Sequence, residues 1–376
     1  MANSNNYVPE SSILDLVNAT IPFRKRLEWG SPAEHQDFPI LNRALAKGMK
    51  ATGGTKVEFR TALKKSTKGG FTGLYATREY NHEDYLVTGE SPWAHLYTYW
   101  MYDDHETAMN RDPERIVDIL EVGRHETMTK MAGIFEEACW QTIIGEATEF
   151  GSLRGIPYWI SKAGTTSLDR SANVLTTVGN INPTTYPLWA NYVGTHTTPV
   201  ANLVAGTIAS TIEEDSLSLL NAMNLAQIKT KFKAPQNIAH IVDKNPLGNY
   251  KIYVNTAFSV AWGIILRHYN LGNNFGFDLA KFNGQHAFNG IPMETVEYLD
   301  LVADGGFGVE TLQGKYPAYF VNANELETVV LRGYEFKESA PQLMQGNPNV
   351  AVTNVDFSVQ LVCKNRKSQA LVYGTA

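Results

Sequence analysis

The sequence has few cysteines, no long hydrophobic run and no secretory signal. Its two cysteines, Cys139 and Cys363, lie far apart in 376 residues, which favours a reducing compartment over a disulfide scaffold. The longest apolar run, Phe258–Leu266, is about half of the roughly 18 residues that indicate a membrane span. The N-terminus lacks the basic start and apolar core of a signal peptide. These absences predict a soluble protein without a membrane partner, made and used inside a cell or released by lysis.

The sequence also lacks an excess of basic residues. The net charge is -6 at pH 7, whereas a protein that grips nucleic acid through its phosphates usually carries a basic excess. Short basic clusters occur at Arg24–Arg26, Lys64–Lys65 and Lys229–Lys233. Clusters of this size are typical of a solvated surface or of a contact between subunits.

Each enzyme signature that the sequence approaches fails at a particular residue. Gly305–Lys315 lacks the spacing of a phosphate loop, and Tyr316 stands where that loop needs serine or threonine. His125 and Glu126 begin a zinc-protease pattern, but Thr129 replaces the second histidine. The sequence contains no G-x-S-x-G. We therefore predict no catalytic residues, no cofactor and no enzymatic activity.

Three further polar groups have structural alternatives to a chemical role. Tyr102–Glu106 gathers four potential metal ligands, but consecutive side chains point in different directions, so capping roles compete with a metal site. Cys139 lies beside Ala138 and Trp140 on a predicted helix, which favours packing over nucleophilic chemistry. His240 lies in an apolar run and is expected to be a hydrogen-bonded interior or interface residue. We predict no metal.

The first part of the chain predicts an arm, a hairpin and a long helix. Residues 1–52 are polar and interrupted by prolines, which indicates an extended arm. Residues 53–92 alternate in polarity around a Gly-Gly pair and predict a projecting hairpin that needs a surface to lie on. Residues 112–145 begin with an Asp-Pro start signal and repeat apolar residues close to every 3.6 positions. They predict a helix that forms the spine of the subunit.

Shorter elements follow, without the regular βαβ alternation of a dinucleotide fold. We expect a helix that starts with a capping box at Thr211–Glu214 and has Leu217, Leu220 and Met223 at the start of its apolar face. We also expect a buried strand at Asn237–Pro246, a helix over Tyr250–His268, and a closing strand in which alternate residues of Val355–Cys363 face one way. The predicted class is α+β.

Four segments, in this order, resemble the major capsid protein of tailed double-stranded DNA bacteriophages, the Hong Kong 97 type of capsid fold. They are the hairpin, the strand and spine helix of Asp103–Glu146, the uncharged stretch GNINPTTYPLWANY at Gly179–Tyr192 after GIPYWIS, and the ending DFSVQLVCKNRKSQALV. The ending contains the triplet Asn365-Arg366-Lys367. The resemblance covers essentially the whole chain.

The resemblance implies an N-terminal arm, an extended loop, a peripheral domain that carries the spine helix, a mainly axial domain, and return strands of the peripheral domain. Their expected ranges are 1–52, 53–92, 93–178 with the helix at about 112–145, 179–320 and 321–376. Tyr186 and Trp189 are expected to anchor the junction between the peripheral and axial domains. Asn365 and Arg366 are expected to serve structure or assembly.

The resemblance also implies a structural role in the virion. Homo-pentamers and homo-hexamers would form an icosahedral shell that encloses phage double-stranded DNA without reading its sequence, assembled in the host bacterial cytoplasm. Expected partners are further copies of the chain, a portal protein and a separate scaffolding protein, with a decoration protein compatible with the fold. The N-terminal region is short for a scaffolding segment, so we expect no proteolytic processing. The negative net charge suits an inner wall along which DNA moves during packaging.

Three alternatives remain open on the sequence. An encapsulin-type bacterial nanocompartment shell would share the fold but enclose protein cargo. An aromatic-rich carbohydrate hydrolase would need a framed pair of carboxylates, for which the sequence offers no pattern. Finally, Lys64, Lys65 and Lys68 lie in the region from which one relative forms a covalent crosslink between subunits, although no partner residue is assignable.

Overall fold

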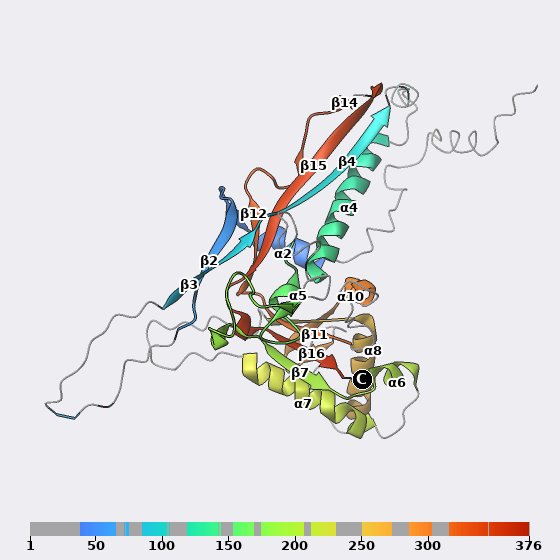
Figure 1. The fold of residues 1–376 in the computed structure, drawn as a ribbon. Helices are drawn as coiled ribbons and strands as arrows, with labels where there is room; N and C mark the ends of the chain where they lie inside the picture. The colour runs from blue at the N-terminus through green and yellow to red at the C-terminus, as the bar shows by residue number, and fades with distance from the viewer. Residues whose placement is uncertain are drawn as a thin grey trace, which may run out of the picture. The chain divides into compact units, whose positions relative to one another are not determined.

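The computed structural model describes most of the chain, and Figure 1 shows its mixture of helices and strands. Contacts divide the chain into two compact units. The first comprises Met1–Pro39, Leu96–Phe135 and Gly333–Phe357, and the second comprises Ile40–His95, Glu136–Arg332 and Ser358–Ala376. The described residues are 38–64, 71, 73, 74, 85–103, 105, 119–141, 143, 153–168, 174–206, 212–230, 250–272, 286–302, 316–344 and 346–375.

The first unit combines one helix with antiparallel strands. Its described elements include most of α4 (Ile119–Trp140), most of β4 (Ala94–Asp103), β13 (Lys337–Glu338), β14 (Gln342–Met344) and the first part of β15 (Asn347–Cys363). Strands β13 and β14 both pair with β15. The core contains Phe357, whose ring meets Phe135 edge-on at 5.5 Å and stacks on Phe336 at 4.6 Å. Such aromatic pairs stabilise beyond the area that they bury.

The predicted spine helix is confirmed over its described part, with a different end. Its predicted start before Ile119 lies outside the described residues. The helix ends at Trp140 rather than near residue 145, because Ile143 instead forms an isolated bridge with Arg154. Inside the helix, Met131 and Phe135 are buried, whereas Ile134, which the apolar repeat places on the same face, is 40% exposed.

The second unit is built on a six-stranded mixed sheet with the strand order β7-β16-β11-β8-β10-β9. Outside this sheet, β1 pairs with β12, which pairs with the end of β15. The sheet strands are β7 (Tyr192–His196), β16 (Ala370–Gly374), β11 (Ala318–Asn322), β8 (Tyr250–Val254), β10 (Ile291–Thr295) and β9 (Ala287–Phe288). Besides the hairpin described below, further strands of this unit are β1 (Met49–Ala51), β12 (Leu326–Leu331), β5 (Ser167–Leu168) and β6 (Val174–Leu175).

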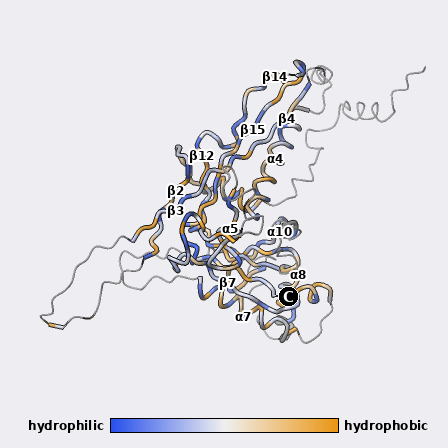
Figure 2. The backbone as a smooth tube through the Cα atoms, viewed as in Figure 1, coloured by the Kyte–Doolittle hydropathy of each residue, from blue (hydrophilic) through white to orange (hydrophobic). Residues whose placement is uncertain are grey.

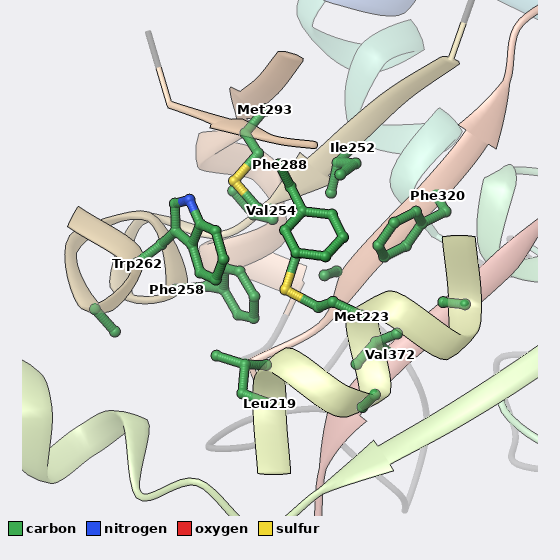
Figure 3. Close-up of a cluster of buried hydrophobic side chains, with 14 of the residues drawn as sticks. Leu219, Met223, Ile252, Val254, Phe258, Trp262, Phe288, Met293, Phe320 and Val372 are labelled. Carbon is green, nitrogen blue, oxygen red and sulfur yellow. The ribbon is translucent and has the colours of Figure 1, made fainter. Parts of the chain in front are cut away.

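Helices cover this sheet and form its main hydrophobic core. Helix α7 packs on β7 and β16, and α8 packs on β10. Figure 3 shows Leu219 and Met223 of α7 reaching toward Phe258 and Trp262 of α8 and toward the sheet residue Phe320. The helices of the unit are α2 (Pro39–Lys47), α5 (Ile156–Trp159), α6 (Val200–Ala205), α7 (Ile212–Thr230), α8 (Thr256–Gly272) and α10 (Glu297–Val302), with single 3-10 turns at η2 (Pro187–Trp189) and η4 (Arg366–Ser368).

The predicted hairpin is confirmed in the second unit. Strand β2 (Lys56–Ala62) pairs antiparallel with β3 (Leu86–Pro92) along its whole length. Val57 and Phe59 are buried and their neighbours are exposed, as the alternation predicts. The Gly-Gly turn lies outside the described residues. Figure 2 shows hydrophobic and hydrophilic residues interleaved along the tube rather than gathered into one long hydrophobic run.

Two element predictions need correction, one is confirmed, and one lies outside the described residues. Tyr250–Val254 is the central strand β8 rather than the start of a helix, because a short apolar run buried on both faces does not reveal its period. On the predicted apolar face of α7, Met223 is buried and Leu220 packs against the core, but Leu217 is 56% exposed, because Leu219 lies on the packed face in its place. The closing strand is confirmed as β15, and its alternate residues from Val355 to Cys363 are all buried; Gln360 is buried as well, because the end of that strand is covered on both faces. The predicted strand at Asn237–Pro246 is not among the described residues.

Candidate functional site

The uncharged stretch begins with a tight turn that needs glycine. Gly179 and Asn180 both have φ near +61°, and Val178 and Ile181 on either side exchange two backbone hydrogen bonds of 3.0 and 3.2 Å. Two consecutive left-handed residues are the pattern of a type I′ turn, for which Asn and Gly are the preferred residues. A Cβ on Gly179 would lie 2.9 Å from the Trp159 ring. The Gly-Asn pair therefore brings the backbone directly against an indole.

The stretch continues into a buried tryptophan. Trp189 ends the 3-10 turn η2 and is 0% exposed. Its indole Nε1 donates a 2.9 Å hydrogen bond to the Val178 carbonyl, and its ring stacks on Phe59 of β2 at 5.9 Å. Tyr186, which precedes the turn, is half-buried, and its carbonyl accepts the Trp189 N–H. The polar, proline-containing segment can therefore bury a tryptophan, because the one polar group of the indole, its Nε1–H, has a hydrogen-bond partner.

A buried arginine joins this tryptophan to two other segments. Arg366 Nε donates to the Trp159 carbonyl at 2.6 Å, and Nη1 donates to the Trp189 carbonyl at 3.1 Å. Its Nη2 donates to Ser161 Oγ at 3.1 Å and to Asn191 Oδ1 at 2.8 Å. Asn191 Nδ2 returns a 2.9 Å bond to the Ser161 carbonyl. The Arg366 side chain thus ties its own segment to two earlier segments of the chain, at residues 159–161 and 189–191.

The environment of Arg366 is unusual for a charged group. It is fully buried, and burial lowers the pKa of the guanidinium to about 10, so the group stays charged at neutral pH. The hydrogen bonds that it makes to described residues end on carbonyl, hydroxyl and amide oxygens, and none ends on a carboxylate. The dipoles of these neutral acceptors therefore stabilise the positive charge in place of water and a counter-ion. This requires that the surrounding structure hold the acceptors in position.

The base of the hairpin is pinned to the same place. Phe59 packs edge-on against Trp159 at 5.8 Å, and Gly89 leaves room for its ring, since a Cβ there would lie 2.3 Å from it. Glu90 donates its N–H to the Gly179 carbonyl at 3.0 Å and accepts a 3.0 Å bond from Asn180 Nδ2. We call Phe59, Trp159, Gly179, Trp189 and Arg366 the tryptophan junction. It fixes the two strands of the hairpin against the rest of the second unit.

The structure brings some of the predicted site residues together and separates others. Trp189 and Arg366 are in direct contact. Asn365 Oδ1 accepts a 3.2 Å bond from the Lys367 N–H and so caps the turn that presents Arg366. Lys64 is exposed beyond the end of β2. Lys65 and Lys68 lie outside the described residues, and a role in assembly for any of these residues stays a prediction.

Substituting Gly179 by alanine is expected to destabilise the unassembled subunit by about 2 to 4 kcal/mol, from left-handed strain plus crowding against Trp159. Gly290→Ala is the matched control, because Gly290 also has positive φ but a Cβ added there would meet no atom within 4 Å. The difference in urea-unfolding free energy between the two variants isolates the crowding. Equal losses would mean that the turn tolerates a methyl group beside the indole.

A second buried polar contact lies at Glu136. Its Oε1 accepts hydrogen bonds from the Ile40 N–H at 3.2 Å and from Trp140 Nε1 at 3.0 Å, and its Oε2 accepts one from the Leu41 N–H at 3.0 Å. Ile40 and Leu41 lie in the first turn of α2, so the carboxylate caps this helix from a distant segment. Burial raises the pKa of Glu136 to about 7, while the three hydrogen bonds act in the opposite direction.

Titration of Glu136 predicts a stability change between pH 4.5 and 7. Because its pKa is raised on folding, the folded chain binds the proton more tightly, and this stabilising contribution is lost as pH rises through about 7. Comparison of wild type with Glu136→Gln isolates the contribution of Glu136. The unfolding free energy of wild type minus that of the variant should fall by roughly 3 kcal/mol from pH 4.5 to pH 8. Urea titrations at four pH values measure this. A difference that grows with pH would mean that the hydrogen bonds to the carboxylate outweigh its burial.

The described residues offer little for chemistry. Cys139 and Cys363 are fully buried, and burial raises the pKa of both thiols, that of Cys363 to about 12, so neither is poised as a nucleophile. The prediction that Cys139 packs in the interior is confirmed. In the part of the chain that the structure describes, no three His, Cys, Asp or Glu side chains converge as for a metal ion. No described helix is long and apolar enough to cross a membrane.

Comparison with known proteins places the fold. No protein-family model and no curated protein sequence matches the chain. A chain of the cyanophage A-1(L) capsid asymmetric unit is similar in structure, with 12% identity, a TM-score of 0.52, and coverage of 93% of this chain and 96% of that one. The bacteriophage PhiM1 mature capsid follows with 11% identity, a TM-score of 0.49, and 94% and 91% coverage. The holo-SrpI encapsulin complex from Synechococcus elongatus PCC 7942 has 10% identity, a TM-score of 0.49, and 97% and 95% coverage.

At these identities the likeness is one of fold. The first of the three is similar over nearly its entire length and over nearly all of this chain. The chain therefore has an α+β capsid fold of the Hong Kong 97 type, as the order of its sequence segments predicts.

Proposed function

We propose that this chain is the major capsid protein of a tailed double-stranded DNA bacteriophage, and that its copies assemble as pentamers and hexamers into the icosahedral shell of the head. The observation that carries the proposal is the capsid fold shared along 93% of the chain with the cyanophage A-1(L) capsid. In this proposal the arm, the extended loop and the peripheral and axial domains follow the ranges expected from the sequence.

Exposed apolar surfaces support a chain that works by association. In the first unit, Tyr97, Tyr99 and Met101 alternate along β4, and each is more than half exposed. In the hairpin region, Phe71 and Leu74 are almost completely exposed. Apolar surfaces left open by an isolated chain are typical of protein contacts. We propose that the hairpin lies across a neighbouring copy, with the tryptophan junction fixing its direction.

The charge of the chain supports a container rather than a DNA-binding protein. With a net charge of -6, the shell would enclose DNA without gripping its phosphates. The proposal includes a portal protein and a separate scaffolding protein as partners during assembly in the bacterial cytoplasm. It includes no enzymatic activity.

Electron microscopy of the purified protein, expressed alone and with its scaffolding protein, tests the proposal. The expected result is closed icosahedral shells of uniform size, which in infected cells contain nuclease-resistant DNA. A chain that stays monomeric in both preparations would contradict it. Closed shells that enclose a defined protein cargo and no DNA would instead establish an encapsulin-type nanocompartment.

A further inference from the structure

Helix α7 has two apolar faces, and the core covers only one of them. Leu219 and Met223 point into the cluster shown in Figure 3 and are fully buried. Leu217, Leu225 and Ile228 are 56%, 48% and 68% exposed. With about 3.6 residues per turn, their positions fall within roughly 80° around the helix axis, on one side of the helix. We call these three residues the α7 outer face.

A groove runs beside the α7 outer face. It has a volume of about 630 Å³ and lies between α7 and β7, an end strand of the six-stranded sheet. Among the described strands, β7 pairs only with β16, so its other edge is not paired with any of them. Gly194 has no side chain and Ala222 has only a methyl group, so little side-chain bulk fills the groove where α7 approaches the strand. The groove is lined by Tyr192, Val193, Gly194, Thr195, Leu217, Ser218, Asn221, Ala222 and Leu225.

The lining of this groove indicates the polarity of its occupant. None of the nine lining residues carries a charge. Such a surface offers no positive charge to the phosphates of nucleic acid and no opposite charge to a charged peptide. It matches an uncharged protein segment with both polar and apolar side chains.

The chain itself carries a segment with these properties. Helix α6 is anchored by Val200 and Leu203, which are buried, while Ala201, Asn202 and Val204 are exposed. No residue of α6 is charged, and the exposed side chains are small. The helix packs on α8, and Figure 1 shows it at the margin of this unit, where it is presented outward.

We propose that α6 of one copy seats in the groove between α7 and β7 of the next copy. The inference rests on the proposed shell function and names a contact that holds neighbouring copies together. Because α6 and the groove are different surfaces of one chain, the contact is heterologous. Repeating it about an axis generates a closed ring when the rotation closes.

Chemical crosslinking tests this contact. The variant Val204→Cys/Leu225→Cys carries one thiol on each of the two surfaces, and both native cysteines are buried. A short bis-maleimide should convert assembled double variant into a ladder from dimer to pentamer or hexamer on a denaturing gel. Each single-cysteine variant should give no ladder above the dimer. Tryptic mapping should find the crosslink between residues 204 and 225 of different copies.

Charges introduced on the two surfaces give an independent test of the same contact. Leu225→Glu places a carboxylate in the uncharged groove and should lower the assembled fraction by about tenfold or more, because a desolvated unpaired charge opposes association. Since Leu225 is exposed in the isolated chain, circular dichroism should show an unchanged fold. Adding Val204→Lys should restore assembly in part by pairing the charges. Val174→Glu, on the exposed strand β6 outside the groove, is the matched control and should assemble normally.

The outcomes separate the contact from the shell function. Closed shells without a ladder and without sensitivity to Leu225→Glu would overturn the α6 contact and leave the proposed function standing. A ladder from rings that never close into shells would support the contact and count against the function. Crosslinks from residue 225 to a different protein, such as a scaffolding protein, would overturn the contact.

Discussion

Replacing Arg366 with methionine is expected to leave the chain largely insoluble. Methionine fills part of the space, but it leaves the Trp159 and Trp189 carbonyls without the guanidinium donors that they now face, and it leaves Asn191 Oδ1 with only the Ser161 hydroxyl. Each unsatisfied buried acceptor costs about 1 to 3 kcal/mol, so the subunit should lose roughly 3 to 5 kcal/mol after relaxation. That loss is a large part of the stability of an ordinary domain. The soluble fraction after expression and urea unfolding of the unassembled subunit measure it.

Two comparison variants separate the geometry of the guanidinium from its charge. Arg366→Lys keeps the charge but replaces a planar fork by a single ammonium group, which cannot reach all four acceptors, so we expect an intermediate loss. Lys367→Met removes the neighbouring charge at an exposed position and should change the free energy of unfolding by less than about 0.5 kcal/mol. If Arg366→Met matched wild type, the arginine would serve assembly or folding kinetics rather than subunit stability.

The sequence predicted the elements whose signals are local. The hairpin at β2 and β3 followed from alternation, and the helix α4 followed from its periodicity, because both patterns reflect which side chains leave water. The burial of Val355–Cys363 on one face was readable for the same reason. The fold followed from the order of such segments along the chain rather than from any one motif.

The organisation of the tryptophan junction was only partly predictable. Trp189 was conspicuous as a tryptophan in a polar stretch, and Arg366 as part of a basic triplet. Phe59, Ser161 and Asn191 gave no comparable signal, because their roles depend on partners more than 100 residues away or on the exact direction of a turn. A sequence pattern contains no information on which carbonyl a buried guanidinium will face.

Glu136 and Leu217 are two further residues whose environment the sequence pattern does not predict, one a buried acid and the other an exposed apolar residue. On a helix of otherwise regular pattern, Glu136 reads as a solvent-facing acid, yet it caps α2, a segment about 95 residues earlier. Leu217 reads as a core residue, yet it faces outward. Residues that violate the local pattern in this way are the ones that long-range contacts explain, within the chain for Glu136 and, in our proposal, between copies for the α7 outer face.

Replacing Trp189 with alanine is the second change with a large expected effect. Trp189 is fully buried, stacks on Phe59, and lies under the Arg366 guanidinium, whose carbon is 5.8 Å from its ring. Truncation leaves a cavity and removes the indole hydrogen bond, so that the Val178 carbonyl keeps only its bond from the Ile181 N–H, and we expect a loss of about 3 to 5 kcal/mol. Because the same ring supports the base of the hairpin, the surviving soluble subunits should also assemble into irregular particles under the electron microscope.

Trp189→Phe distinguishes the cavity from the hydrogen bond. Phenylalanine keeps an aromatic ring against Phe59 but cannot donate to the Val178 carbonyl, so it should lose about 1 to 3 kcal/mol. Tyr186→Ala, at the half-buried start of the turn, should lose less than either variant. If Trp189→Ala gave shells of normal size and stability, the hairpin would be positioned by Glu90 and its backbone contacts alone, and the stretch Gly179–Tyr192 would be an ordinary loop. If Trp189→Phe and Trp189→Ala were equally damaging, the indole hydrogen bond rather than the packed volume would hold the turn.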